Sequence, residues 1–244
     1  MTCYYITNLE PISRTGFAAM DKLNDIMTGR RTVVSVLAGF ALAAFMLLVP
    51  VELRASGTPE AFIGQLRDSA VKELTDKSVP HEQRKQRFRQ LLAEGFDIPA
   101  IGSFVTAKYW RRADAAAQQD FLDVFQDVIT LRFLPIFDHF EEGMELEVNR
   151  VVNDKDSPRV IDVFSTLVRP VGEPVSIAWR ILETDSVYQI VDVRVENLSM
   201  AITLRSEYTS LLQRHNGDMA ALAKELRRRV AAGDVGDPAI TNAQ

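Results

Sequence analysis

Apolar residues recur along this chain at two different spacings, and the change of spacing divides it into three parts. Between residues 58 and 135 they recur every three or four positions, which is typical of amphipathic helices. From residue 144 to 195 apolar residues such as Leu146 and Val148 alternate with polar residues such as Glu145 and Glu147, which indicates half-buried strands. Helical spacing returns after residue 199. Helices, then strands, then helices predict one α+β domain with helices packed on a curved sheet.

Each predicted helix begins where a side chain can accept hydrogen bonds from the free backbone N–H groups of the first turn. The predicted starts are Thr58 with Pro59, Ser78 with Pro80, Asp97, Asp114 and Asp218. Glycine ends a helix readily and proline interrupts one, so the predicted ends are Gly95, Pro135 and Asn216-Gly217.

Four strands joined by short turns, at about 144–149, 160–168, 175–182 and 187–195, predict an antiparallel meander. In the fourth strand Val191, Val193 and Val195 are expected on one face. The second strand is apolar on both faces. Since a shift of one residue inverts a strand, its buried face stays open.

The N-terminal part has the pattern of an export signal. The uncharged run from Val33 to Val49 follows Arg30-Arg31 and precedes Leu53-Arg54-Ala55, which predicts cleavage near Ala55. The run is also at the lower limit of the length needed to cross a membrane, so an uncleaved inner-membrane anchor is the alternative. We therefore divide the chain into an extension and signal peptide at 1–55, a folded domain at 56–231 and a flexible tail at 232–244.

Composition narrows the possible functions. The chain has 244 residues, with 28 Lys and Arg against 33 Asp and Glu and a net charge of −5, which argues against nucleic-acid binding. Its one cysteine, Cys3, excludes a disulfide framework. The three histidines, His81, His139 and His215, are too widely spaced for a common zinc motif. We expect no metal and no cofactor.

Catalysis remains an alternative with little support. Asp138-His139 could form an acid–base pair with Asp162 or Asp192. The sequence contains no Gly-x-Ser-x-Gly, no His-Glu-x-x-His and no phosphate-binding loop. We expect a protein that is not an enzyme. A purely structural adaptor with a filled core is the third alternative.

Several short segments, taken in order, resemble one known family. They are Phe96-Asp97-Ile98-Pro99-Ala100-Ile101, Ala107-Lys108-Tyr109-Trp110, Ala117-Gln118-Gln119-Asp120-Phe121, Trp179-Arg180, Asn197-Leu198-Ser199-Met200 and Glu207-Tyr208-Thr209-Ser210-Leu211-Leu212. From about residue 60 to 230 this succession resembles the MlaC family, also called the toluene-tolerance family of periplasmic phospholipid carriers.

The resemblance implies a cystatin-like fold, close to that of nuclear transport factor 2, around an apolar cavity. It implies a periplasmic carrier that moves phospholipid between the outer and inner membranes and so maintains outer-membrane asymmetry. The implied partners are phospholipid, an outer-membrane lipoprotein complex and an inner-membrane ABC transporter with a ring of MCE domains. Phospholipid would be cargo rather than cofactor. A neighbouring branch linked to hopanoids leaves another lipid open as the alternative.

A lipid carrier must shield acyl chains, because exposing about 16 methylene groups to water costs on the order of 12 kcal/mol. Any one apolar residue is more often core than ligand contact, so the prediction applies to the set. The predicted lipid-binding residues are Phe104, Tyr109, Trp110, Phe121, Phe125, Ile129, Phe133, Val163, Ile177, Trp179, Arg180, Ile181, Val193, Val195 and Met200.

The lipid phosphate should stay near water and close to a basic side chain. Arg180 is the first candidate, followed by Lys108, Arg111 and Arg112. Two basic runs, residues 84–87 and 227–229, are either docking faces or ordinary solvated helix surfaces.

Overall fold

The computed structural model of this chain describes residues 57–185 and 187–236. These residues belong to one compact unit, Leu53–Gln244. The predicted signal peptide, its cleavage site and the end of the predicted tail lie outside the described residues.

The helices begin where the capping residues predict. The order is α1 (Pro59–Leu74), α2 (His81–Gly95), α3 (Ile98–Thr106), the 3-10 helix η1 (Ala107–Arg112), α4 (Ala115–Phe133), the 3-10 helix η2 (Leu134–His139), then after the strands α5 (Met200–Arg214) and α6 (Met219–Ala232). Thr58, Asp97, Asp114 and Asp218 each accept a hydrogen bond from the backbone N–H three residues later. The second helix starts after Pro80 without a side-chain cap.

The sheet is antiparallel throughout, in the order β1 (Glu145–Asn153), β2 (Val160–Val168), β3 (Val175–Thr184), β4 (Val187–Val195) and β5 (Leu198–Ser199). It therefore has five strands, and the prediction of four is corrected. Glu196 and Asn197, with φ of 49° and 67°, form a two-residue turn that returns the chain against β4. A strand of two residues is too short to show an alternating pattern. The cystatin-like assignment stays a prediction.

Two register shifts decide which side chains point inward. The first lies between Val148 and Arg150, and the second places one extra residue, Val191, between Ile190 and Asp192. Because of the second bulge, Ile190 pairs with Ile181 and Val193 pairs with Trp179, so all four share the inner face. Without the bulge, simple alternation along β4 would place Ile190 on the outer face when Val193 lies on the inner face.

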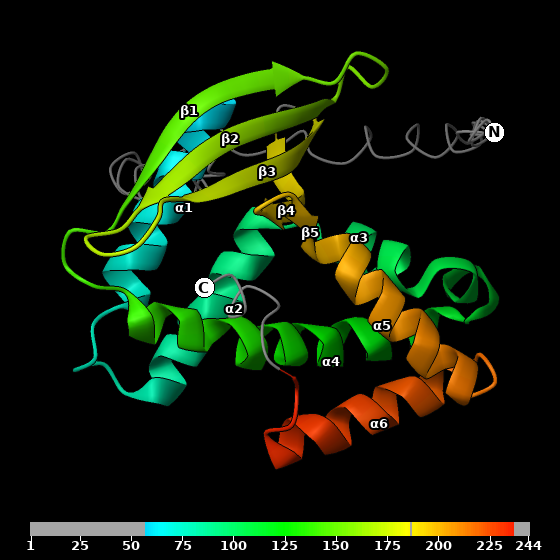
Figure 1. The fold of residues 1–244 in the computed structure, drawn as a ribbon. Coiled ribbons are helices and arrows are strands. Elements are labelled where there is room, and N and C mark those ends of the chain that lie inside the picture. Colours follow the sequence, from blue (N-terminus) through cyan, green and yellow to red (C-terminus); the bar gives the residue numbers. More distant parts are fainter. Residues whose placement is uncertain (1–56, 186, 237–244) are drawn as a thin grey trace, which may run out of the picture. The chain divides into compact units, whose positions relative to one another are not determined.

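The sheet and the helices form two layers (Figure 1). Helix α1 packs against β1 and β2, whereas α2, α3 and α5 contact β4. Behind these helices the core is solid: Phe121 and Phe125 stack, and both meet the ring of Tyr208 edge-on. Burial raises the pKa of the Tyr208 phenol, which therefore stays neutral.

The chain leaves α6 through Gly233, whose φ is 70°. Val235 is buried, and the Nε of Arg132 donates to its carbonyl oxygen at 2.8 Å. Arg132 also pairs with Glu207 on α5. Thus the described residues at the start of the predicted tail pack against α4.

Candidate functional site

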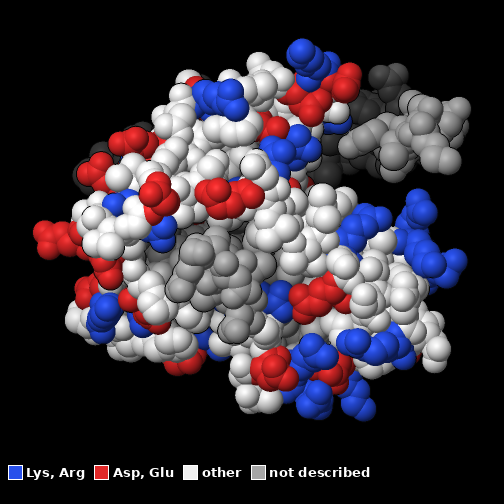
Figure 2. All heavy atoms as spheres, in the orientation of Figure 1, with Lys and Arg blue, Asp and Glu red and all other residues white. Residues whose placement is uncertain are grey.

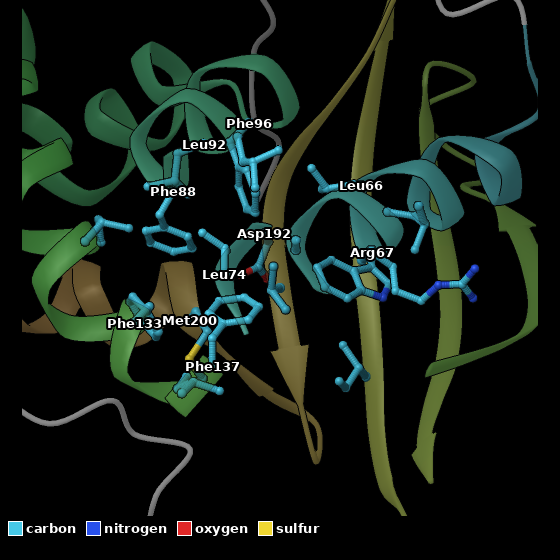
Figure 3. A pocket seen from close by; sticks show the side chains of 18 of the residues that line it. Leu66, Arg67, Leu74, Phe88, Leu92, Phe96, Phe133, Phe137, Asp192 and Met200 are labelled. Carbon is cyan, nitrogen blue, oxygen red and sulfur yellow. The ribbon is translucent and has the colours of Figure 1, made fainter. Parts of the chain in front are cut away.

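A cavity of about 340 Å³ lies between the inner face of the sheet and the helices. Its walls are almost wholly aliphatic and aromatic. Figure 3 shows side chains from both layers converging on it, including Leu66 of α1, Phe88 of α2, Phe133 of α4 and Met200 of α5. Helices thus supply one side of the cavity and strands supply the other.

The strand side of the cavity comes from one end of the sheet. Leu146, Leu167, Ile177, Trp179 and Val193 line it. In register, Trp179 lies between Val163 and Val193, and Ile177 lies between Ser165 and Val195. Helices and sheet do not close on each other at this end, so these side chains face a hollow.

The cavity reaches solvent near η2. Ile136, which belongs to the lining, is 37% exposed. Its neighbours Phe137 and Phe140 also line the cavity, together with Leu146 at the start of β1. This opening is bordered by apolar side chains, as an entrance for a hydrocarbon chain requires.

Two charged residues contribute to the lining, and both are already engaged. Arg67 donates from Nη1 to the carbonyl oxygen of Leu146 at 3.0 Å and pairs with Asp68. Asp192 accepts from the Ser199 hydroxyl at 2.7 Å and from the Ala201 backbone N–H at 2.9 Å, which secures the start of α5. The lining therefore offers shape and apolar surface rather than a reactive group.

The orientation of Trp179 is set by a hydrogen bond. Its indole Nε1 donates to the Ser165 hydroxyl at 2.9 Å. Since the indole N–H is satisfied on the neighbouring strand, the rest of the ring can face the cavity. Ser165 is buried, and it supplies a polar partner that an all-apolar strand face would lack.

Some of the sequence-predicted residues line this cavity. They are Phe125, Ile129, Phe133, Ile177, Trp179, Val193 and Met200. That these residues contact a lipid stays a prediction.

Other predicted residues are placed in the solid core instead. Phe121, Val163 and Ile181 are fully buried in packed clusters, and Val195 is 6% exposed beside β3. Tyr109 packs over Gly217, where a Cβ would stand only 2.8 Å from its ring. These side chains belong to the close-packed core. The apolar pattern of the sequence does not distinguish a core residue from one that lines a cavity.

Phe104, Trp110 and Arg180 lie away from the cavity. Phe104 is 40% exposed, because the buried stripe of α3 runs through Ile98, Ile101 and Val105. Trp110 is half-buried in η1, at a shallow surface hollow that also includes Lys108 and Arg111. None of these residues is brought to the opening.

Arg180 belongs to an ion-pair network on the outer face of the sheet. It donates to both oxygens of Asp162 at 3.0 Å, and Arg194 approaches the same carboxylate at 2.9 Å. Burial raises the pKa of Asp162, but the hydrogen bonds from Arg180 and the adjacent Arg194 guanidinium outweigh this effect and hold that pKa below its ordinary value. The network joins β2, β3 and β4, so Arg180 has a structural role here.

The acid–base candidates are not assembled into a site. Asp138 pairs with Arg84 at 2.6 Å, and Asp162 pairs with arginines rather than with histidine. His139 is exposed at the end of η2. Within residues 57–185 and 187–236, no group of three or more potential metal ligands is found. Over the same residues, no helix has both the length and the apolarity needed to cross a bilayer.

The sequence prediction missed the contribution of the first helices. Lining residues absent from it include Leu66, Ala70 and Leu74 of α1, Phe88, Leu91 and Leu92 of α2, Phe96, and Ile136, Phe137 and Phe140 near the opening. The helical spacing of Ile63, Leu66 and Ala70 did indicate a buried stripe on α1. That spacing could not show that the stripe faces a hollow.

The fold and the cavity define a class: an α+β protein that holds an apolar space between an antiparallel sheet and a helical layer. The sequence profile described as MlaC protein matches residues 65–228, which is most of the chain. This protein belongs to the MlaC family, so the resemblance seen in the sequence is confirmed.

Among solved structures, the chain is similar to a phospholipid-binding protein from Ralstonia solanacearum, whose structure was determined in complex with a phospholipid. The TM-score is 0.63 at 16% sequence identity, and the match covers 72% of this chain and 99% of that one. At this identity the similarity establishes a shared fold. No curated protein matches the sequence.

Proposed function

We propose that this protein binds a phospholipid with its acyl chains in the cavity and carries it across the periplasm. The main support for this proposal is the cavity itself, which is apolar on both its helical and its strand side. An ordinary hydrophobic core would not contain a space of this size, because native interiors pack to the density of organic crystals.

The chemistry of the lining supports cargo rather than catalysis. The volume of about 340 Å³ lies within the range typical of small-molecule sites. Membership of the MlaC family and the phospholipid in the Ralstonia solanacearum structure favour a phospholipid as the cargo. A hopanoid is the alternative cargo.

The wider pathway is part of the same proposal. The predicted signal at 1–55 would export the domain at 56–231. The carrier would then exchange lipid between an outer-membrane lipoprotein complex and an inner-membrane ABC transporter with MCE domains, and so keep the outer membrane asymmetric.

The first test is the lipid content of the protein recovered from its own periplasm without detergent. We expect about one diacyl phospholipid per protein by mass spectrometry. A hopanoid in its place would still support a lipid carrier, with a different cargo. A protein that is empty and also takes no lipid from vesicles would contradict the proposal.

A cavity-filling variant tests the location of the lipid. Ala70 lines the cavity from α1, whereas Ala61 on the same helix is exposed. We expect Ala70→Trp to lose bound lipid because the indole occupies the space of the acyl chains. The matched variant Ala61→Trp should load as wild type does. Equal lipid content in the two variants would place the lipid elsewhere.

Trp179 offers a direct optical readout. The chain has two tryptophans, Trp110 and Trp179, and only Trp179 lines the cavity. In a Trp110→Phe variant we expect a blue shift of the emission when delipidated protein takes up lipid, because lipid displaces water from the indole. An unchanged spectrum together with lipid uptake would separate Trp179 from the binding site.

The transport role needs a test in cells. A strain lacking this protein should be more sensitive to detergents, and the Ala61→Trp chain should restore resistance where the Ala70→Trp chain does not. Restoration by both variants would disconnect the cavity from the envelope function.

A further inference from the structure

Some basic residues in the described part of this domain form ion pairs with carboxylates and others do not. The basic runs of α2 and α6 are neutralised: Arg84 pairs with Asp138, Arg87 with Glu73, Arg227 with Asp120, and both Arg228 and Arg229 with Glu225. These helix faces therefore carry little net charge toward a partner.

The cations around η1 and α5 are different. Among the described residues, Lys108, Arg111 and Arg205 form no ion pair with a carboxylate. All three border one shallow hollow, together with Ser103, Ala107 and Trp110. Figure 2 shows a corresponding group of blue side chains at the right of the molecule, over the region of α3, η1 and α5. Their charge is uncompensated in a chain whose net charge is −5.

Two large apolar side chains stand among these cations. Phe104 is 40% exposed on α3, and Ile202 is 63% exposed on α5. Arg205 links them: its guanidinium lies 4.7 Å from the Phe104 ring centre, its Nη1 donates to the Phe104 carbonyl oxygen at 3.1 Å, and it follows Ile202 by three residues on α5. The residues Phe104, Lys108, Arg111, Ile202 and Arg205 form what we call the α3–α5 face.

The α3–α5 face is separate from the cavity. The same two helices line the cavity through Ile98, Ile101, Met200, Ala201 and Leu204. None of the five residues of the face belongs to that lining. A role for the face therefore goes beyond cargo binding and does not depend on it.

We propose that the α3–α5 face docks the protein reversibly on an anionic membrane surface. Basic side chains next to exposed aromatic and aliphatic side chains are the combination that binds the boundary between lipid headgroups and acyl chains. Electrostatic attraction acts on Lys108, Arg111 and Arg205, while Phe104 and Ile202 reach between the headgroups. Because the chain as a whole has a net charge of −5, this local positive charge favours an orientation with the α3–α5 face toward the membrane.

A bilayer fits this face better than an acidic protein does. Phe104 and Ile202 project singly from the outer sides of two helices, whereas a protein partner is usually anchored by side chains that enter a matching pocket. The hollow beside them is shallow, and three cations border it together with Ser103, Ala107 and Trp110. A surface of mobile headgroups requires no pocket.

The test uses the chain as recovered from the cell envelope and measures its co-flotation with vesicles. We expect binding to vesicles that contain phosphatidylglycerol, little binding to pure phosphatidylcholine, and release by salt. The double variant Lys108→Glu with Arg111→Glu should weaken binding by roughly tenfold or more, since each cation near an anionic surface contributes about a fivefold effect.

A matched control separates the face from net charge. Lys77 and Lys155 are exposed and lie elsewhere, so Lys77→Glu with Lys155→Glu makes the same change in charge. This control should bind nearly as wild type does. Ile202→Ser should weaken binding severalfold without a change in charge, because it removes the apolar contact. The lipid content of every variant should equal that of wild type.

Two results would overturn the proposal. Equal loss in the two double variants would show that net charge alone governs attraction to the vesicles. The second result combines two observations: the wild-type chain binds to no vesicle, and the double variant at Lys108 and Arg111 still fails to restore detergent resistance in cells. The face would then bind an acidic protein rather than a membrane. In both cases the measured lipid content of the protein would still support the proposal that it is a phospholipid carrier.

Discussion

The inner face of the sheet carries similar apolar residues at both ends, but only one end is packed. Ile181 and Ile177 lie on the same face of β3, four residues apart. Ile181 is completely buried against Ile161 and Ile190 of the neighbouring strands and Ile63 of α1. Ile177 is half-buried and faces the cavity. We call these the packed end and the hollow end of the sheet.

The side chains of α1 contribute to this difference. Near its start the helix packs Ile63 against the residues of the packed end, and Ile63 also borders the cavity. Further along, the helix presents the small side chain of Ala70 to the cavity. Residues on one face of the same strand are therefore packed at one end of the sheet and line a hollow at the other. The five predictions below test this contrast and the ion-pair network on the outer face, in order of decreasing effect.

The largest loss is expected at the packed end. Ile181→Ala leaves a hole surrounded by close-packed side chains, and such truncations cost about 2–5 kcal/mol. Denaturant unfolding of the delipidated protein measures it. A loss below that of Ile177→Ala would refute the division of the face into two ends.

The second prediction concerns the outer face, opposite the junction between the two ends. Asp162→Asn removes the carboxylate shared by Arg180 and Arg194 and leaves both arginines partly buried without it. We expect a loss of about 1–3 kcal/mol, between the values for exposed and buried pairs. Asp156→Asn, at an exposed turn residue, is the control and should be nearly neutral.

The same carboxylate gives stability a pH dependence. Because the pKa of Asp162 is lower in the folded protein, its contribution is complete above the ordinary value of 3.8 and is lost as the pH falls through the folded-state pKa. Below pH 3.8, wild type should therefore lose stability more steeply than Asp162→Asn. Parallel curves for the two proteins would contradict the sign of this shift.

A smaller effect is expected from Ser165→Ala at the hollow end. The Trp179 indole would lose its hydrogen-bond acceptor, which costs about 1 kcal/mol when water can partly replace it. The indole should also become less ordered, which lowers its fluorescence anisotropy in the Trp110→Phe background. Unchanged anisotropy would mean that packing alone orients the ring.

The smallest change in stability is expected for Ile177→Ala. The side chain already borders an open space, so its removal enlarges an existing cavity and costs less than about 1 kcal/mol in delipidated protein. The stabilisation that bound lipid adds to wild type should shrink in this variant. A full core-like loss would show that the hollow end is packed after all.

Much of the secondary structure could be predicted from local chemistry. Asp97, Asp114 and Asp218 cap helices because a side-chain oxygen and a free backbone N–H lie within the same turn. The strand β5 could not be predicted, since two residues show no period. The bulge at Val191 also escaped prediction, because it interrupts the alternation by one residue without a distinctive residue type.

The candidate site was predictable only in part, for a related reason. Phe133 and Phe121 belong to the same helix, yet Phe133 lines the cavity and Phe121 is buried against Tyr208. Arg180 was assigned to a lipid phosphate from its sequence neighbourhood, whereas the structure pairs it with Asp162. Hydrophobic periodicity reports which face of an element avoids water and contains no information about the distance to the element opposite.

The class of fold, the order of its elements, most of the helix starts and membership of the MlaC family could all be inferred from the amino-acid sequence alone. These depend on interactions between near neighbours or on the succession of short segments. Which apolar residues enclose a space and which fill one became clear only from the three-dimensional packing. That outcome depends on how far α1 and the other helices stand from the sheet, and the separation is set by all the packed side chains together.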